Sequence, residues 1–300
     1  MKKLYTVLVI AMVAALVLAA CGSSAPQADN LLDAIKQRGY IMISTDPNYE
    51  PQSFLNTEGK RPSDTKCPSD ALTTAEMQGF DVDVAKAIGD GIGVETCFAT
   101  PDWDVITAGN WADKWDVSVG SMTITTKRQQ ILDFSVPYYY TPAVIAVRAD
   151  AGIKSLADLD GQALCVGTST TYEFWLNGDM EGLGLPASSI YAQPPKVTVV
   201  PLPTDQECAQ AIAAGREDFV GYVTSQTVVN ANIAAGFPVV QLGSPVYSED
   251  LAAAFDKSST LPTASLITEV NNIITAMHND GRLSDLSNKW FGEDLTKAPN

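Results

Sequence analysis

Histidine is almost absent from this 300-residue chain, which has only His278. Cysteine is scarce as well, with five residues and no close Cys-x-x-Cys pair, so a metal site has few candidate ligands. The sequence also has no nucleophile triad, no zinc-protease helix and no phosphate-binding loop. These absences argue against metal-dependent and nucleophilic catalysis, and we expect neither a metal nor a cofactor.

Positive charge is in short supply: 19 Lys and Arg residues face 35 Asp and Glu residues, for a formal net charge of -16 at pH 7. A surface this acidic repels the phosphate backbone of nucleic acids and anionic lipid headgroups. We therefore expect no nucleic-acid partner. Hydrophobic residues make up 46% of the chain, which predicts a globular body large enough for two hydrophobic cores.

The one long hydrophobic run lies at the N-terminus. Lys2 and Lys3 precede mainly apolar residues from position 4 to 20, and the run stops at Cys21. This pattern is typical of a secretory signal. A membrane-spanning anchor is the alternative, because the run is at the short limit for crossing a bilayer.

The end of this run, Leu18-Ala19-Ala20-Cys21, resembles the lipobox of bacterial lipoproteins. The resemblance implies that Cys21 is lipidated and becomes the first residue of the mature chain. We therefore expect a signal peptide over residues 1–20 and a small, polar tether over residues 21–30. The protein is then extracytoplasmic and anchored to a membrane, at the cell surface or in a periplasm.

Beyond the tether, short apolar strands alternate with helical stretches in two series, which is typical of α/β layers. The first series begins with a helix after the possible cap Asn30 and reaches a strand at residues 116–120. The second begins with a strand at residues 163–166 and ends with a helix over residues 204–215. Each series predicts one lobe.

Two further apolar stretches, residues 143–148 and 251–255, bracket the second series and are candidates for paired crossovers between the lobes. An apolar stripe at helical spacing over residues 266–277 then predicts a long helix that packs back onto the first lobe. The predicted boundaries are residues 31–145 with 252–300 for lobe I and residues 146–251 for lobe II.

Four cysteines remain once Cys21 is set aside, and an exported protein is expected to form two disulfides from them. Four cysteines allow three connectivities. The lobe boundaries place Cys67 and Cys97 in one lobe and Cys165 and Cys208 in the other. We predict the disulfides Cys67–Cys97 and Cys165–Cys208.

Residues 57–78 interrupt the first series with Ser, Thr, Pro, Asp and Gly and few large apolar side chains. This composition predicts a surface loop, pinned by Cys67 near its middle. A binding or lid role for the loop is the alternative.

Several segments resemble a known family. Residues 79–88, GFDVDVAKAI, are similar to the signature segment of the family 3 bacterial extracellular solute-binding proteins, the polar amino-acid receptors of ABC importers. Further similar segments follow in order: Thr45–Pro51, Gly120–Thr125 with Arg128, Asp133–Ser135 with Pro137–Tyr139, Ser155–Gly161, the threonine-rich turn up to Thr171, Asp280–Gly281 and Lys289–Gly292. The resemblance implies a type II periplasmic-binding fold, in which two α/β lobes joined by two hinge strands close on a small ligand.

Arg128 is the strongest candidate for ligand binding, because its planar guanidinium matches a carboxylate. It lies just inside a predicted helix that Thr125 can cap. The resemblance implies that Arg128 and Thr123 hold the ligand's α-carboxylate, beside Gly120 and Ser121 of the same segment. A surface arginine is the alternative interpretation.

Across the cleft, Thr171 matches a ligand-contacting position of the family, although a turn with ordinary N-caps is the competing interpretation. Tyr49 and Trp103 match positions where the family places aromatic rings around the ligand. Core packing is the alternative for both. Asp46 is placed either to meet a polar side chain of the ligand or to form a turn before Pro47.

One departure from the family concerns the ligand's amine. Members that bind α-amino acids carry an Asp shortly after a Gly-Arg-x-Asp segment, and here, after residues 215–218, that position falls on Val223. Three explanations stay open. Asp46 or another acid takes its place, Tyr222 and Trp103 hold the amine by cation–π contact, or the ligand has no primary α-amine.

Two other functions are conceivable on this fold. A cyclohexadienyl-dehydratase-like enzyme needs a general acid in the cleft, for which Glu173 and Asp46 are nominal candidates without a partner. A lipoprotein that presents its ligand to a separate sensor is the second. Gln52 stands where Phe is common in the family, so the family's standard ligand specificity should not be assumed. We predict a monomeric, non-enzymatic receptor that binds a polar amino acid or related small carboxylate and delivers it to an ABC permease.

Overall fold

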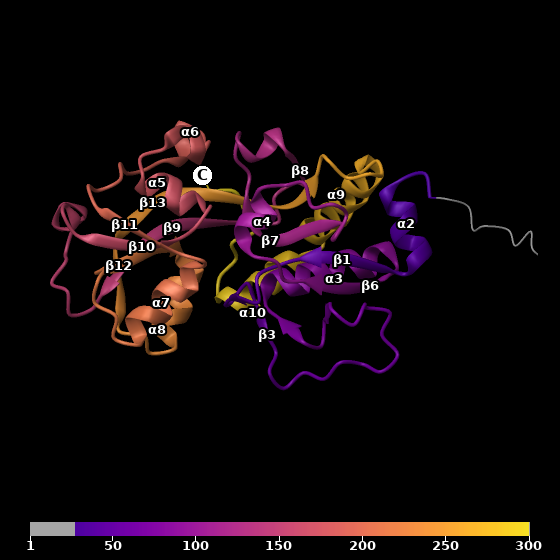
Figure 1. Cartoon of the computed structure of the whole chain (residues 1–300), viewed down its shortest axis with the longest axis horizontal. Helices are drawn as coiled ribbons and strands as arrows, with labels where there is room; N and C mark the ends of the chain where they lie inside the picture. Colours follow the sequence, from indigo (N-terminus) through magenta and orange to yellow (C-terminus); the bar gives the residue numbers. More distant parts are fainter. Residues whose placement is uncertain (1–27, 300) are drawn as a thin grey trace, which may run out of the picture.

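A computed structural model of the chain describes residues 28–299 (Figure 1). The predicted signal peptide, Cys21 and most of the predicted tether lie outside the described residues. None of the helices found over residues 28–299 is long and apolar enough to cross a membrane.

Lobe I, on the right in Figure 1, begins at a helix whose two ends follow from the sequence. The Asn30 side chain accepts a hydrogen bond from the N–H of Asp33, and Gly39 ends the helix with a φ of 82°. The lobe contains α2 (Leu31–Arg38), β1 (Tyr40–Ser44), β2 (Asn48–Tyr49), β3 (Ser53–Leu55), β4 (Leu72–Thr73), β5 (Met77–Gln78), α3 (Phe80–Ile92), β6 (Glu95–Ala99), α4 (Trp103–Thr107), β7 (Val117–Thr123), the 3-10 turn η1 (Arg128–Gln130), β8 (Leu132–Phe134), α9 (Ala264–Asn279) and α10 (Arg282–Phe291).

Lobe II repeats the strand–helix alternation on the other side of the molecule. Its central strand, β10, pairs in parallel with β11 and β12. The lobe contains η2 (Leu156–Leu159), β10 (Ala163–Gly167), α5 (Thr171–Leu176), α6 (Met180–Leu183), η3 (Ala187–Ser189), β11 (Thr198–Leu202), α7 (Asp205–Ala213), β12 (Gly221–Ser225) and α8 (Gln226–Ala234). Its apolar side chains form two clusters that are separate from the main cluster of lobe I.

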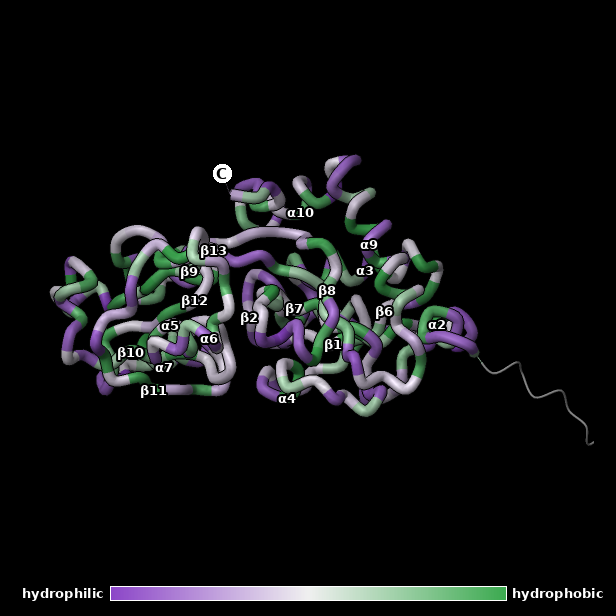
Figure 2. The backbone as a smooth tube through the Cα atoms, turned by 90° about the horizontal axis from the view of Figure 1, so that it is seen from above, coloured by the Kyte–Doolittle hydropathy of each residue, from purple (hydrophilic) through white to green (hydrophobic). Residues whose placement is uncertain are grey.

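Two long strands, β9 (Tyr139–Arg148) and β13 (Val239–Asp256), run between the lobes as an antiparallel pair (Figure 2). They confirm both predicted crossovers and extend well beyond them. Through this pair the strands form one path in the order β11-β10-β12-β9-β13-β7-β1-β6-β4, with β8 attached to β13. The β9–β13 register shifts between Leu242 and Tyr247.

The terminal helix is confirmed as part of lobe I. Leu266, Val270, Ile274 and Met277 of α9 are buried in the same cluster as the apolar face of α3. Spaced at i, i+4, i+8 and i+11, they form one stripe along the helix.

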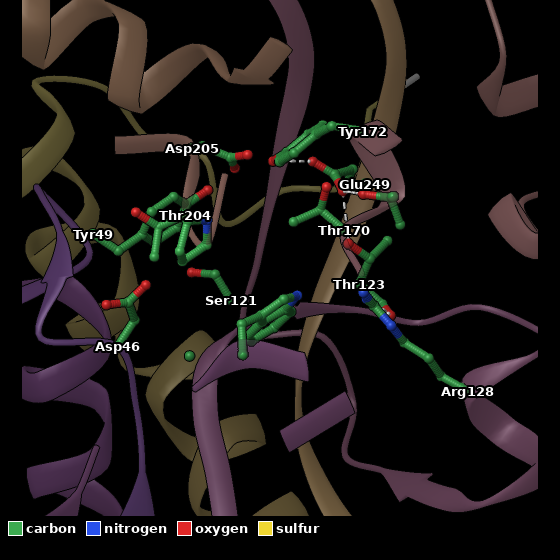
Figure 3. A pocket seen from close by; sticks show the side chains of 14 residues that line it. Asp46, Tyr49, Ser121, Thr123, Arg128, Thr170, Tyr172, Thr204, Asp205 and Glu249 are labelled. Carbon is green, nitrogen blue, oxygen red and sulfur yellow. Dashed lines mark hydrogen bonds between the residues drawn. The ribbon is translucent and has the colours of Figure 1, made fainter. Parts of the chain in front are cut away.

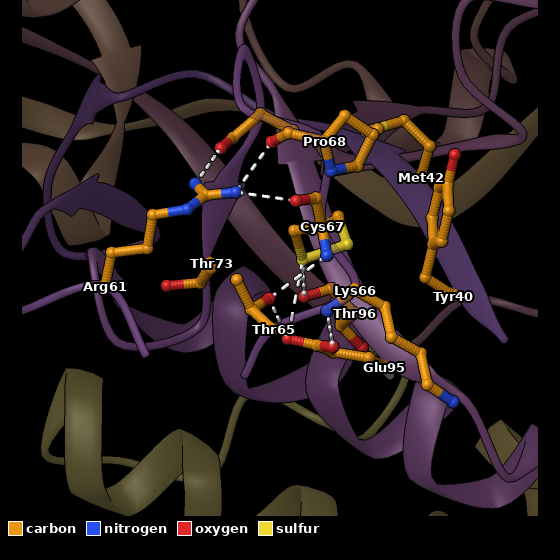
Figure 4. The surroundings of a disulfide bond; sticks show 12 residues. Tyr40, Met42, Arg61, Thr65, Lys66, Cys67, Pro68, Thr73, Glu95 and Thr96 are labelled. Atoms are coloured by element: carbon orange, nitrogen blue, oxygen red, sulfur yellow. Dashed lines mark hydrogen bonds between the residues drawn. A yellow bond between two sulfur atoms is a disulfide. The ribbon is translucent and has the colours of Figure 1, made fainter. Parts of the chain in front are cut away.

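Both predicted disulfides are present, Cys67–Cys97 in lobe I and Cys165–Cys208 in lobe II. Figure 4 shows the first, which ties the segment at residues 57–78 to β6. The Arg61 guanidinium supports this segment by donating to the carbonyl oxygens of Cys67 and of neighbouring residues. The segment is mostly loop, as predicted, with β4 and β5 near its end.

Candidate functional site

A cavity lies between the lobes, beside the hinge strands. It is lined by Asp46, Tyr49, Trp103, Gly120, Ser121, Thr123, Arg128, Thr170, Thr171, Tyr172, Pro203, Thr204, Asp205 and Glu249. The structure thus brings together eight of the nine ligand-binding residues predicted from the sequence (Figure 3).

Arg128 is held in place from both lobes. Its Nη1 donates to the carbonyl oxygen of Thr123 at 3.0 Å, and its Nη2 donates to that of Ser169 in lobe II at 3.2 Å. The remaining guanidinium N–H groups form no hydrogen bond within residues 28–299. The predicted helix is a single 3-10 turn, and Thr125 does accept from the Arg128 N–H, at 3.1 Å. Burial lowers the pKa of Arg128 to about 10, so the guanidinium stays charged at neutral pH.

Two residues that flank the cavity adopt left-handed backbone conformations, Ser121 with a φ of 53° and Ser169 with a φ of 59°. Non-glycine residues rarely adopt this region, and it persists only where the surroundings enforce it. For Ser121 the support comes from the hydroxyl, which donates to buried Asp81 at 2.7 Å, and from the N–H, which donates to Tyr138. The side chain of Ser121 therefore works as an anchor of its strand end.

The aromatic residues of lobe I lie at the cavity as predicted. The Arg128 guanidinium carbon is 5.5 Å from the ring centroid of Trp103, and the indole Nε1 of Trp103 is buried without a hydrogen-bond partner in the described chain. Tyr49 donates its hydroxyl proton to Ser225 across the cleft, at 3.3 Å. Trp111 and Trp115, by contrast, are core residues with ring centroids 5.3 Å apart.

Tyr222 does not line the cavity. Its ring is fully buried in the cluster beneath α7 and α8, and its hydroxyl accepts a hydrogen bond from Asn232. Val223 faces the opposite side of β12 and packs in the other apolar cluster of lobe II. Neither residue presents a group to a ligand, so the cation–π role considered for Tyr222 is incompatible with its position.

Sequence reasoning missed two acids that line the cavity, Asp205 and Glu249. Asp205 is the first residue of α7, and its carboxylate accepts from the N–H of Gly167 at 2.7 Å and from the hydroxyl of Thr224 at 3.2 Å. Burial raises its pKa to about 8. Asp46 joins Asp205 on the side of the cavity away from Arg128 (Figure 3), and burial raises the pKa of Asp46 as well.

Glu249 is on β13 and is 1% exposed. Three hydroxyl groups donate to it: those of Thr123 and Thr171 to Oε1, both at 2.6 Å, and that of Tyr172 to Oε2, at 2.8 Å. Burial raises its pKa even though these hydrogen bonds favour the carboxylate. Glu249 thus connects Thr123 of lobe I to the helix start of lobe II.

Direct contacts between the lobes hold the cleft closed. The amide of Gln52 is fully buried and donates to Thr227 at the start of α8, at 2.5 Å. Gln210 donates to Asn48 at 3.2 Å. Gln52 therefore has a polar role that the phenylalanine common at this position cannot perform. Glu173, the nominal general acid, accepts from the N–H of Ser169 and is not among the cavity-lining residues.

Residues 41–293 match the family model of the bacterial extracellular solute-binding proteins, family 3. Among curated relatives, the chain is similar to the L-cystine-binding protein TcyJ of Escherichia coli K12. The two are 27% identical over 271 residues, which cover 90% of this chain and 89% of the relative.

Solved structures are similar over most of this chain. An ancestral amino acid-binding protein, described as a precursor of cyclohexadienyl dehydratase, gives a TM-score of 0.68 at 29% identity and covers 87% of this chain and 99% of its own. An ancestral arginine-binding protein bound to arginine gives a TM-score of 0.67 at 26% identity, covering 85% and 99%. The predicted two-lobed fold with two hinge strands is confirmed.

Proposed function

This chain belongs to the bacterial extracellular solute-binding proteins of family 3, and from that premise we propose that it captures a polar amino acid, or a related small carboxylate, for an ABC importer. The ligand is held in the cavity between the lobes, and the closed lobes present it to the membrane permease. Buried Arg128, with guanidinium N–H groups left over at the cavity, is the observation that carries the proposal.

The chemistry of the cavity matches a zwitterion. Arg128 supplies a cation with a rigid donor fork, which suits the planar carboxylate of an amino acid. Asp46 and Glu249 supply acids for positively charged groups of the ligand, whereas Asp205, whose pKa burial raises to about 8, is a neutral hydrogen-bonding group at neutral pH. Trp103 adds an aromatic face and an indole N–H that has no protein partner. An acid excess of this kind favours ligands that carry at least one ammonium or guanidinium group.

Delivery to a permease requires that the receptor stays near the membrane. We infer that residues 1–20 direct export, that Cys21 carries the lipid and that the segment up to residue 30 is the tether. Lobe I then comprises residues 31–145 and 252–300 and lobe II residues 146–251, in a monomer. Labelling with a palmitate analogue tests the anchor: wild-type protein takes up the label, and Cys21→Ala does not.

A ligand panel tests the proposed function. Protein that begins at Gly22 is unfolded and refolded to remove bound ligand, and its thermal unfolding is followed with each of the common amino acids and with L-cystine. A ligand that binds only the folded state stabilises it by mass action, by about 2.7 kcal/mol at a hundredfold excess over Kd. We expect a rise in Tm with one or a few polar amino acids. Stabilisation by plain carboxylates or quaternary amines but by no zwitterion contradicts the assignment of an amino acid as the ligand.

A further inference from the structure

The three acids that line the cavity, Asp46, Asp205 and Glu249, form no salt bridge within residues 28–299, and Glu249 is the most deeply buried of them. Glu249 is almost completely buried, and its hydrogen bonds come from hydroxyl groups. A buried carboxylate without a directly bonded cation is unfavourable, which is why buried charges in proteins are usually paired. Arg128 is near enough to act on the pKa of Glu249 but forms no ion pair with it. Its position at the cavity makes a ligand the available partner.

The directions of its hydrogen bonds show which kind of ligand group fits. A hydroxyl has one proton to donate, and Thr123, Thr171 and Tyr172 all donate theirs to Glu249. These hydroxyls therefore offer only lone pairs to the cavity. A corner made of three such hydroxyls and a carboxylate accepts N–H donors and repels a carboxylate.

Glu249 and its three hydroxyl partners also lie close to Arg128, which is proposed to bind the ligand's carboxylate. The Arg128 guanidinium donates to the backbone carbonyl of Thr123, and the hydroxyl of the same Thr123 contacts Glu249. In an α-amino acid the ammonium and the carboxylate are attached to one carbon atom. A ligand whose carboxylate meets Arg128 must therefore place its ammonium close by, whereas Asp46 and Asp205 lie toward the far side of the cavity (Figure 3).

We propose that Glu249 is the residue that binds the ligand's α-ammonium, with Thr123 and Thr171 as additional acceptors. This inference rests on the proposed function. It answers the question raised by Val223, whose side chain packs in the core of lobe II. The acid that binds the ammonium then comes from hinge strand β13, whereas Val223 lies on β12 of lobe II.

A second reading of the same contacts has the opposite consequence. In this alternative Glu249 is an internal substitute for the ligand's carboxylate, since the resemblance assigns Thr123 to that carboxylate and Thr171 to a ligand contact. The carboxylate of Glu249 then competes with the ligand, and its removal strengthens binding. The direction in which Glu249→Gln changes the affinity for amino acids distinguishes the two roles.

The test is Glu249→Gln, which keeps the size of the side chain and removes its charge. Asp250→Asn is the matched control, because Asp250 is the next residue on β13 but does not line the cavity. Refolded wild-type and variant proteins are titrated calorimetrically with L-arginine, L-glutamine and L-cystine. The des-amino analogues, 5-guanidinovalerate, glutaramate and 3,3′-dithiodipropionate, are titrated alongside.

We expect Glu249→Gln to weaken binding of the amino acid at least about thirtyfold, the factor that corresponds to ~2 kcal/mol for a buried charge pair. Binding of the matching des-amino analogue stays within about threefold of wild type, since the analogue has no ammonium to lose. Asp250→Asn leaves both unchanged.

Other outcomes overturn the inference. Tighter binding of amino acids by Glu249→Gln identifies an internal substitute, and an equal loss for amino acid and analogue identifies a structural role. If Glu249→Gln does not fold, Glu249→Asp is titrated in its place. The wild type is informative by itself, because a wild-type protein that binds an amino acid and its des-amino analogue equally has no ammonium site. If no amino acid binds wild-type protein, the proposed function fails. If an amino acid binds but the ratio of its affinity to that of its des-amino analogue is the same in wild type and Glu249→Gln, only the role of Glu249 fails.

Discussion

Replacing Arg128 by alanine removes the one buried cation of the cavity and is expected to abolish tight binding. Arg128 is 5% exposed, and its guanidinium lies over the face of Trp103 and donates to two backbone carbonyls from different lobes. The carbonyl of Thr123, in the same lobe, orients the guanidinium before the lobes close, which lowers the ordering entropy that opposes the contact.

The magnitude follows from the burial. Truncating one partner of a buried, hydrogen-bonded charge pair costs about 2–5 kcal/mol, because the other charge is left desolvated and unpaired. For the ligand carboxylate opposite Arg128 this corresponds to a Kd between about thirtyfold and several thousandfold weaker. A further contribution falls on the closed state, since Ser169 of lobe II loses its hydrogen bond from Arg128.

Calorimetric titration of refolded protein with the best ligand of the panel measures this change. Lys114→Ala is the control, because Lys114 is an exposed cation of lobe I that is not among the cavity-lining residues. We expect the control to bind like wild type. Affinity of Arg128→Ala within about threefold of wild type, in a variant that unfolds cooperatively, refutes the role given to the guanidinium.

Three further predictions concern closure, stability and pH. Gln52→Leu loses the buried hydrogen bond to Thr227 across the cleft, so ligand affinity should fall by about 1 kcal/mol, measured by titration; unchanged affinity contradicts a closing role. Changing Cys165 and Cys208 together to alanine opens a loop with a sequence separation of 43, and the chain-entropy model predicts a loss of about 4 kcal/mol in denaturant unfolding; a loss below about 1 kcal/mol contradicts it. Burial raises the pKa of Asp205 to about 8, so the folded protein holds its proton from about pH 4 up to about pH 8, and this group's contribution to the free energy of unfolding falls as pH rises through that window. Asp205→Asn should therefore flatten the pH dependence of unfolding between those limits, and an unchanged slope means that Asp205 is ionised in the folded state.

Much of the fold could be predicted because local signals determine it. Asn30 and Gly39 mark the ends of α2 through cap geometry, and the apolar stripe of α9 shows its buried face. The two crossovers were visible as apolar stretches, but their full length was not, because β13 continues through polar residues that only its pairing with β9 keeps extended.

The site was predictable where a residue acts within its own segment. Thr123 ends β7 and Arg128 begins η1, so the two residues lie close together in the sequence and can be recognised as one motif without knowledge of the fold. Asp205 was missed because an acid after the N-cap Thr204 is what any helix start favours. Glu249 was missed because it lies among polar residues of β13, between Ser248 and Asp250, and because its partners come from two lobes that only the closed fold brings together.

The most direct test of the central claim, that the cleft captures a zwitterion through Arg128, is a pair of calorimetric titrations of refolded protein. One uses the amino acid that stabilises it most, and the other uses the methyl ester of the same amino acid, which keeps the ammonium and lacks the carboxylate charge. We predict one binding site per chain for the amino acid and at least about thirtyfold weaker binding for the ester. Equal affinity for the two ligands contradicts the claim.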